Sequence, residues 1–371
     1  MRGPTSWYFF GRRSDQTVAG SVTWSSTEMI LGSSRMKGRV APESDGVSDS
    51  AHDRSEQGRE YSRTMAVSPA SNTATTRRMT VGVALPQMAE GLDRDRLRAW
   101  CRGVDDGPYS SVSAGERITF HNLDGFTLCT AAAALTERVR ILVNVAVLPW
   151  HAPALVAKEL ASMDVVSAGR VEVAVGVGGR QQDYAALGSP FSGRHRRLDE
   201  AVVEMKRLWA GGAAADGERV GPAPLQAGGP PIMASAMGPK SLARAAKWAI
   251  GVSGFTLLGD PGEAAKLFRA TEAAWSDAGR TDAPRLVTGS FVALGDGAKS
   301  TLRNFAEAYL KVFSPELAKG LSEAMPLHDP SALVDLLDAV EAAGADEFIV
   351  VPATSDPRML DRLTEVVSAR R

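Results

Sequence analysis

The chain has 371 residues, of which 44% are apolar and 23% charged, and its formal net charge is −1. This composition is typical of a globular protein and excludes a fully disordered, collagenous or disulfide-stapled chain. The near-zero charge argues against a nucleic-acid partner or a basic membrane anchor. The sequence has no run of about 18 apolar residues, the length needed to span a bilayer. Only Cys101 and Cys129 are cysteines, and we expect both to be small buried residues in a reducing, cytoplasmic environment.

The first 78 residues differ in composition from the rest. Only 23 of them are apolar, with a single Leu and a single Ile. Such a segment cannot bury enough apolar surface to offset the entropy lost on ordering, so we interpret residues 1–78 as a disordered leader. The run Trp7–Phe10 is too short for the apolar core of a secretory signal. A translation start at Met65 or Met79 would also explain the segment, and we favour that explanation.

From Met79 onward, short apolar runs alternate with segments of helical periodicity. The sequence predicts strands at 81–86, 110–115, 141–148, 171–177, 232–236, 250–255, 285–294 and 346–352. It predicts helices at 94–104, 126–137, 239–248, 261–278 and 356–369. A further helix starts at Pro153 and ends near Gly169, another follows Ser192 and runs to Trp209, and a longer helical stretch follows the strand 285–294 and ends near residue 343. Ser192 is expected to cap the helix that ends at Trp209.

Eight β–α repeats match the size and order of an α/β fold of the (β/α)8 TIM barrel type, which we assign to residues 79–371. An open doubly wound sheet is the structural alternative, but its Gly-x-Gly-x-x-Gly fingerprint is absent after the first strand. The loop 211–231 is too long for a plain connector, and we interpret it as an insertion or a lid.

Several barrel chemistries are excluded by residue type. The five histidines are scattered along the chain, which argues against a metal-dependent hydrolase, and we expect no metal. The predicted strand 250–255 lacks the lysine of a Schiff-base aldolase. No Gly-x-Ser-x-Gly motif is present either. Because barrel chemistry lies at the C-terminal strand ends, we looked for candidate residues there.

Two strand ends have the small residues of phosphate-binding turns. The first contains Gly178, Gly179 and Arg180, and the second contains Ser235, Ala236, Met237 and Gly238. Small residues let backbone N–H groups approach an anion, and the N-terminus of a following helix favours negative charge. Glycines at a strand–helix turn can also simply make the turn. Two such turns at one barrel mouth favour phosphate binding.

Asn144 interrupts the apolar third strand. A buried amide without partners costs about 1–3 kcal/mol, so either neighbouring backbone satisfies it or the strand is distorted there and faces a ligand ring.

These features carry a resemblance. The strongest stretches are 131–140 (AAAALTERVR), 163–170 (MDVVSAGR) and 176–179 (GVGG), followed by 187–191 (LGSPF) and the pairs Asp199-Glu200 and Leu208-Trp209. In these stretches the chain resembles the luciferase-like monooxygenase superfamily, whose members use FMN or the deazaflavin coenzyme F-420. The resemblance covers most of 79–371 and is most specific in 125–210.

The resemblance implies a TIM-type barrel with an insertion and a planar flavin at its C-terminal mouth. It places the ring on a distorted third strand, often with a non-prolyl cis peptide, at Asn144, Val145 and Ala146. It places the phosphate groups at Gly178, Gly179 and the Ser235–Gly238 turn. Relatives act on small molecules and are often homodimers. A flavin carries the redox chemistry itself, so no triad or metal cluster is required.

One strand end departs from the family pattern. Deazaflavin-dependent relatives often have Asp-His or Glu-His after the second strand, where this chain has Glu116-Arg117. Arginine cannot act as an acid or base near neutral pH because its pKa exceeds about 12. Proton transfer would then fall to Glu116, to His121 or His151, or to the substrate. We take Glu116 and Arg117 as catalytic candidates and expect Arg117 to hold an anionic group, with a salt bridge at the rim as its structural alternative.

The sequence therefore predicts a flavin-type oxidoreductase that carries out hydride transfer or oxygen insertion on a small organic substrate. The Arg-, Ala- and Gly-rich composition is typical of high-GC genomes and favours coenzyme F-420. An FMN-dependent monooxygenase that uses externally reduced flavin is the alternative. A non-catalytic flavin- or ligand-binding barrel is an alternative of another class, motivated by Glu116-Arg117.

Overall fold

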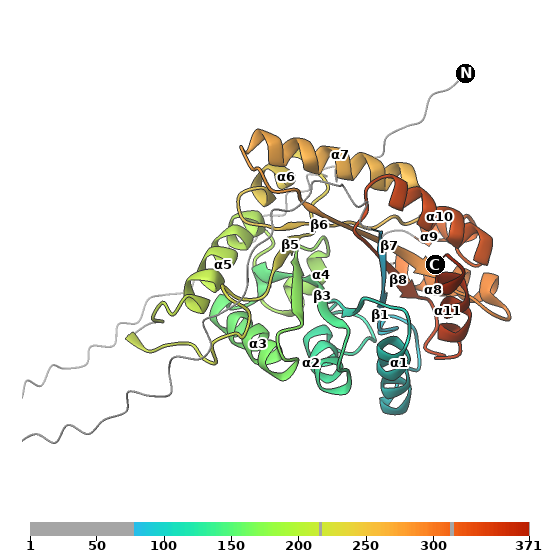
Figure 1. Cartoon of the computed structure of the whole chain (residues 1–371), viewed down its shortest axis with the longest axis horizontal. Coiled ribbons are helices and arrows are strands. Elements are labelled where there is room, and N and C mark those ends of the chain that lie inside the picture. The colour runs from blue at the N-terminus through green and yellow to red at the C-terminus, as the bar shows by residue number, and fades with distance from the viewer. Residues whose placement is uncertain (1–77, 215–216, 312–314, 371) are drawn as a thin grey trace, which may run out of the picture. The chain divides into compact units, whose positions relative to one another are not determined.

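Runs rich in Val, Ile and Ala form eight short parallel strands, which close into a barrel (Figure 1). The structure is a computed structural model that describes residues 78–214, 217–311 and 315–370. Each strand pairs with the next along the chain, and the last pairs with the first. The strands are β1 (Thr80–Ala84), β2 (Ser111–Ala114), β3 (Arg140–Ala146), β4 (Val171–Val175), β5 (Ile232–Ala234), β6 (Gly251–Ser253), β7 (Arg285–Val292) and β8 (Glu347–Pro352). The predicted (β/α)8 barrel is confirmed.

Helices surround this barrel and bury their apolar faces against it (Figure 1). They are α1 (Arg94–Asp106), α2 (Gly125–Leu135), the 3-10 helix η1 (Leu148–Trp150), α3 (Pro153–Val166), α4 (Gln181–Ala186), α5 (Arg194–Trp209), α6 (Pro239–Ala245), α7 (Pro261–Asp277), α8 (Ala298–Leu310), α9 (Pro315–Glu323), α10 (Pro330–Ala342) and α11 (Met359–Ala369). The helical stretch predicted after the seventh strand is thus three helices, α8 to α10. Cys101 and Cys129 are free and buried as predicted, and burial raises the pKa of both thiols to about 12.

Two local predictions are corrected. Gly193, not Ser192, is the N-cap of α5, and its φ of 68° lies in the left-handed region that favours glycine. The loop 211–231 cannot be a lid over the C-terminal mouth, because it joins a helix to the start of a strand. Its Gln226 Nε2 donates to Asp164 Oδ1 at the end of α3 and to Val171 O at the start of β4, both at 2.7 Å. The loop is therefore anchored at the N-terminal end of the barrel.

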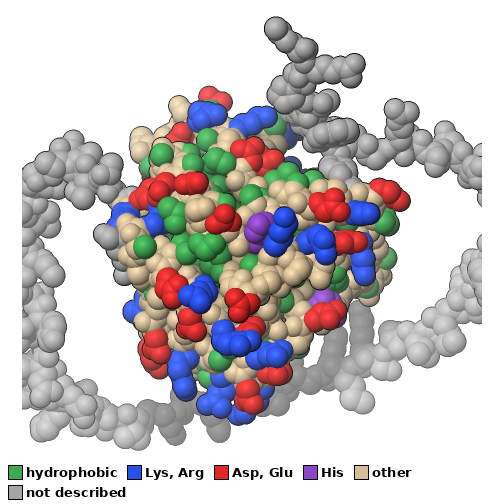
Figure 2. Space-filling model, turned by 90° about the vertical axis from the view of Figure 1, so that its right-hand side faces the viewer, with side chains coloured by type: hydrophobic (Ala, Val, Ile, Leu, Met, Phe, Trp, Pro, Cys, Tyr) green, Lys and Arg blue, Asp and Glu red, His purple; other side chains and the backbone are tan. Residues whose placement is uncertain are grey.

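The predicted leader, residues 1–78, lies outside the described residues except for Arg78. Among the described helices, none is long and apolar enough to cross a membrane. Figure 2 shows one face of the molecule, on which acidic and basic side chains are interspersed rather than gathered by sign.

The barrel interior changes in character along its axis. Side chains alternate between the two faces of a strand, so β3 places Arg140, Leu142 and Asn144 at successive depths. The middle layer is apolar and consists of Ala84, Leu142, Ala174, Met233, Val287 and Ile349. This apolar layer separates charged residues at the N-terminal end from the polar C-terminal mouth.

Four charges fill the N-terminal end of the barrel. Arg140 and Arg285 each pair with both Glu172 and Glu347, at N–O distances of 2.5–2.8 Å. Glu347 is fully buried, and its Oε1 also accepts from the hydroxyls of the two serines that precede and start β2. Burial by itself raises the pKa of Glu347, but the two guanidinium charges outweigh it and hold the pKa below its usual value. The N-terminal end is therefore filled by paired charges.

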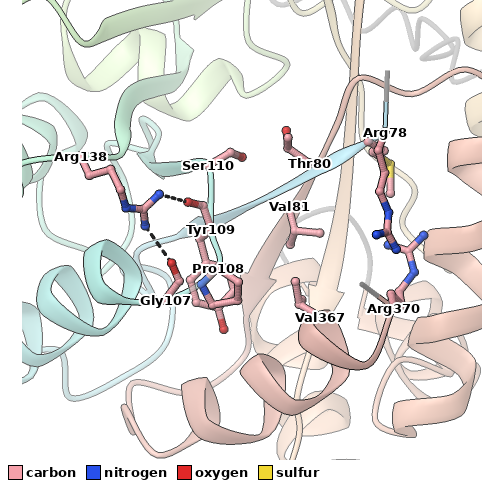
Figure 3. A pocket seen from close by; sticks show the side chains of 11 residues that line it. Arg78, Thr80, Val81, Gly107, Pro108, Tyr109, Ser110, Arg138, Val367 and Arg370 are labelled. Atoms are coloured by element: carbon pink, nitrogen blue, oxygen red, sulfur yellow. Dashed lines mark hydrogen bonds between the residues drawn. The ribbon is translucent and has the colours of Figure 1, made fainter. Parts of the chain in front are cut away.

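A cavity of about 610 Å³ lies outside the barrel at this same end (Figure 3). It is bordered by the start of β1, the loop before β2 and the end of α11. Its Arg138 donates to the carbonyls of Gly107 and Tyr109, and its Arg370 pairs with Asp338 and Glu341. Because TIM barrels place their chemistry at the opposite end, this cavity stands apart from the candidate active site.

Candidate active site

Strand β3 is irregular where it reaches the mouth. The peptide bond between Asn144 and Val145 is cis, and the pairing with β4 shifts in register between Asn144 and Ala146. Asn144 Oδ1 accepts a hydrogen bond from Ser253 Oγ of β6 at 3.0 Å. The distorted third strand implied by the sequence resemblance is therefore present, and the amide of Asn144 also has a partner.

Gly115, directly after β2, makes room for this irregular backbone. A Cβ at this position would lie 2.2 Å from Asn144 O and 2.6 Å from Val145 N, far inside contact distance. Gly125 at the start of α2 packs on Gly115 in turn, since its own Cβ would lie 2.3 Å from Gly115 O. The backbones of β2, β3 and α2 therefore meet without intervening side chains. Glycine at 115 is required by close approach.

The glycine turn after β4 lies beside the end of β3. A Cβ on Gly176 would contact Val145 Cγ1 at 3.0 Å, and one on Gly178 would lie 2.9 Å from Val147 Cγ1. Gly178 has a φ of 58°, in the left-handed region, whereas a Cβ on Gly179 would meet nothing within 4 Å. The structure thus brings the predicted ring-binding backbone and the first predicted phosphate turn together.

The second predicted phosphate turn follows β5 and adjoins the first. Ser235 Cβ would lie 3.3 Å from a Cβ on Gly176. The N–H of Ser235 donates to Val175 O at 2.8 Å, and that of Gly238 donates to Ser241 Oγ at 3.1 Å. The side chain of Met237 is 78% exposed, whereas that of Ala236 is buried. The two turns face the same end of the barrel. In the second turn, Ser235 and Gly238 use their N–H groups within the protein, so the N–H groups of Ala236 and Met237 are the ones left for a phosphate.

Glu116 pairs with His151 rather than with a neighbour on its own strand. Its Oε1 lies 2.7 Å from His151 Nε2, and its Oε2 accepts from Val147 N at 2.6 Å. Burial alone lowers the pKa of His151, but the hydrogen bond and charge of Glu116 outweigh it and raise that pKa. Trp150 Nε1 also lies 2.9 Å from His151 Nε2, which can either accept from Trp150 or donate to Glu116. The raised pKa favours donation to Glu116.

Arg117 is buried, with 6% of its surface exposed. Its guanidinium lies over the rings of Phe120, at 3.7 Å, and Tyr309, at 4.5 Å. It makes one long hydrogen bond, from Nη2 to Tyr309 O at 3.4 Å, whereas Nε and Nη1 have no partner among the described residues. The rim salt bridge considered for Arg117 is therefore not formed within that part of the chain.

Arg180 is held by a small network that joins the segments after β2 and β4. Its Nε donates to Asp183 Oδ2 at 3.0 Å, and its Nη2 donates to Thr119 Oγ1 at 2.9 Å. Asp183 Oδ1 accepts from the N–H and the hydroxyl of Thr119. Burial by itself raises the pKa of Asp183, but these hydrogen bonds and the Arg180 charge lower it. Arg180 Nη1 remains without a partner among the described residues.

A family model described as luciferase-like monooxygenase matches residues 79–328 of this chain. The chain belongs to the luciferase-like monooxygenase family. The matched range contains β1 to β7 and the mouth residues described above. The resemblance seen in the sequence is confirmed.

Two curated relatives of this luciferase-like protein match over shorter stretches. The uncharacterized protein Rv0940c of Mycobacterium tuberculosis is 36% identical over 89 residues, which are 24% of this chain and 31% of the relative. The pyrimidine monooxygenase RutA of Escherichia coli is 36% identical over 97 residues, which are 25% of this chain and 26% of the relative. The chain therefore spans less than a third of the length of these curated relatives.

Solved structures share the luciferase-like fold at lower identity. An F-420-dependent secondary alcohol dehydrogenase, in complex with an F-420–acetone adduct, has 19% identity and a TM-score of 0.67 and covers 79% of this chain and 99% of that one. The oxygenating constituent of 3,6-diketocamphane monooxygenase from Pseudomonas putida, in complex with FMN, has 15% identity and a TM-score of 0.59 and covers 78% and 96%. Both cofactor types named from the sequence occur among these neighbours.

Sequence reasoning missed several residues of this luciferase-like mouth. Asp183 stands three residues after Arg180, a spacing typical of helical ion pairs, and could have been found. Tyr309 is 192 residues from Arg117, and no pattern in the sequence links them. His121, considered for proton transfer, is exposed and its ring lies against Phe120. Within the described ranges, no three His, Cys, Asp or Glu side chains come together as a metal site.

Proposed function

We propose that this luciferase-like protein is an oxidoreductase that binds coenzyme F-420 or FMN at the C-terminal mouth of its barrel. Its reaction would be hydride transfer or oxygen insertion on a small organic substrate. The observation that carries the proposal is the bare backbone floor at the mouth. There the irregular Asn144–Ala146 segment lies between Gly115 and Gly176, where any larger side chain would collide with it or crowd it.

The residues at the mouth fit a planar ring with a phosphate tail. The Asn144–Ala146 backbone would support the ring, and the two turns at Gly178 and Ser235 would hold the phosphate. Arg180 Nη1 has no partner in the described chain and adds positive charge beside the first turn. Gln87 Nε2 donates to Gly115 O at 2.6 Å, while its buried Oε1 has no described partner. That oxygen fits an N–H group of a flavin-type ring.

A bound deazaflavin supplies hydride chemistry, whereas a bound flavin also permits reaction with oxygen. The protein's own task is to orient the ring, to bind the substrate and to hold a proton. The proton shared by Glu116 Oε1 and His151 Nε2 is held at the end of β3, and Glu116 also fixes that end through Val147 N. Glu116 would act through His151, and Arg117 would act on the substrate.

We favour coenzyme F-420 over FMN because of the Arg-, Ala- and Gly-rich composition of the chain. We also propose a homodimer. Leu135 of α2 and Leu155, Val165 and Val166 of α3 are between 43% and 51% exposed. Exposed apolar side chains on neighbouring helices favour association with a second copy.

The experiment is a titration of the full chain with each cofactor, followed by cofactor fluorescence. We expect one of the two to bind, and the bound reduced form to be turned over when candidate substrates are added. Gly179→Asp should weaken binding because its carboxylate repels the phosphate, whereas Gly179→Ala should not, since a Cβ there meets nothing within 4 Å. Binding without any turnover would favour the non-catalytic ligand-binding barrel. Failure of both cofactors to bind would contradict the proposal.

A further inference from the structure

Arg117 presents more hydrogen-bond donors than the protein uses. A guanidinium carries five N–H groups and stays charged in proteins. Here its hydrogen bond to Tyr309 O is long, and Nε and Nη1 are buried without a hydrogen-bond partner among the described residues. Burial lowers the pKa of Arg117, and this effect together with the nearby charge of Arg180 outweighs Tyr309 and Asp183, which raise it. A buried charge in this state is unfavourable for the folded protein unless something else pairs with it.

Asp183 is the carboxylate whose charge acts on Arg117, but both of its oxygens already have partners. Its Oδ1 accepts hydrogen bonds from Thr119, and its Oδ2 accepts one from Arg180. Two guanidinium groups, those of Arg117 and Arg180, therefore share the neighbourhood of one carboxylate. Asp183 pairs with Arg180, so the positive charge of Arg117 is left without a carboxylate partner among the described residues, and Arg117 has two nitrogens without a partner where Arg180 has one. At the other end of the barrel, by contrast, Arg140 and Arg285 each pair with two carboxylates.

The walls around Arg117 are aromatic. The rings of Phe120 and Tyr309 lie against the guanidinium, an arrangement that is favourable when it is shielded from water. Tyr309 continues edge to face into Phe291, which continues into Phe255, with centroids 5.1 and 4.8 Å apart. Phe255 is 39% exposed. A molecule that reaches Arg117 from the mouth therefore meets apolar ring surface first and a cation behind it.

We infer that Arg117 binds the anionic group of the substrate, a carboxylate or a phosphate carried on an apolar body. This inference rests on the proposed function, because it assigns a substrate class to the same mouth. Nε and Nη1 are buried in the structure, so a neighbouring side chain must move aside for the anion to reach them. The ring faces hold the guanidinium in place before that movement.

The first experiment uses benzoate and inorganic phosphate as probes on the full chain, with Tm as readout. A ligand that binds the native state alone raises Tm with its concentration. We expect benzoate or phosphate to raise the Tm of the wild type and of the exposed control Arg362→Met. The affinity should fall about tenfold or more in Arg117→Met, and Arg117→Lys should recover part of it because the charge is kept. Equal shifts in wild type and Arg117→Met, or no shift in the wild type, would overturn the inference.

A second arm separates the substrate's anion from the cofactor's own phosphate. The cofactor that binds in the titration above is added at saturation, and the benzoate titration is repeated. If Arg117 serves the substrate, benzoate still binds and Arg117→Met leaves the cofactor affinity unchanged. If cofactor blocks benzoate and Arg117→Met weakens the cofactor itself, the assignment to substrate is wrong. Benzoate binding in a chain that binds neither cofactor would instead contradict the proposed function and leave the anion site standing.

Discussion

The two ends of the barrel surround their arginine side chains with different kinds of neighbour. At the N-terminal end, Arg140 and Arg285 lie in a closed set of ion pairs with Glu172 and Glu347. At the C-terminal end, Arg117 is more deeply buried than those two arginines and has aromatic rings in place of carboxylates. The apolar middle layer separates the two ends. The first arrangement satisfies every charge from within the chain, and the second leaves a charge for something outside it.

This contrast separates the charges that stabilise the fold from those that are available for binding. Residues at the N-terminal end of a TIM barrel act on stability, and those at the C-terminal end act on function. A site that must bind an anion cannot also be satisfied by its own carboxylate. An arginine without a carboxylate partner is therefore expected to make the protein less stable than a paired one would.

The largest effect should come from the paired end. Glu347→Gln removes one partner from both Arg140 and Arg285, so the free energy of unfolding should fall by about 3–5 kcal/mol. Chemical denaturation, followed by circular dichroism and by tryptophan fluorescence, measures this free energy. The exposed Glu365→Gln, which loses only a surface pair with Arg362, is the matched control and should leave stability unchanged. Equal effects of the two substitutions would show that the N-terminal set is not structural.

Gly115→Ala should come next. Its Cβ would lie 2.2 Å from Asn144 O, so the end of β3 must shift, at about 1–3 kcal/mol of stability. Cofactor affinity should fall with it, because the shifted segment is the proposed floor for the ring. Gly179→Ala should change neither quantity, which makes it the control for the loss of a glycine. Normal stability and affinity in Gly115→Ala would contradict the close packing of β2 on β3.

Arg117→Met tests the contrast directly. Without ligand, this variant should unfold at the same free energy as the wild type or a higher one, within about 1 kcal/mol, because removing an unpaired buried charge offsets the lost contacts with Phe120 and Tyr309. The same denaturation experiment measures it beside Glu347→Gln. A loss as large as that of Glu347→Gln would mean that Arg117 is paired within the protein.

The smallest effect is a pH dependence at His151. The folded pKa is raised above the unfolded value of about 6.5 by Glu116, so the protonated pair stabilises the protein fully below that value. This contribution is lost as pH rises through the folded pKa. The Tm difference between wild type and His151→Gln should therefore shrink from acid to alkaline pH. In a Glu116→Gln background, adding His151→Gln should give a Tm difference that does not change with pH. A Tm difference between wild type and His151→Gln that grows with pH would be evidence against the pair.

Part of the site was predictable because it depends on local sequence. The glycines after β4 and the small residues after β5 are turns that any strand–helix junction of this kind displays. Asn144 marked the irregular strand because an amide is unusual in an apolar run. The family resemblance then supplied the meaning of that irregularity. The length of the loop 211–231 suggests a lid, but a helix-to-strand connection has to lie at the N-terminal end of the barrel.

Local sequence was sufficient to predict the order of the eight strands, because periodicity and turn residues act over a few positions. Which charges meet depends instead on the tertiary fold. Arg140 reaches Glu347 across 207 positions of sequence, and Arg117 reaches Tyr309 across 192. Such contacts exist because the barrel closes β8 onto β1 and brings the end of α8 next to the segment after β2. Coulomb and cation–π energies depend on distance in space, and the distance in space is set by closure of the barrel and not by any local pattern.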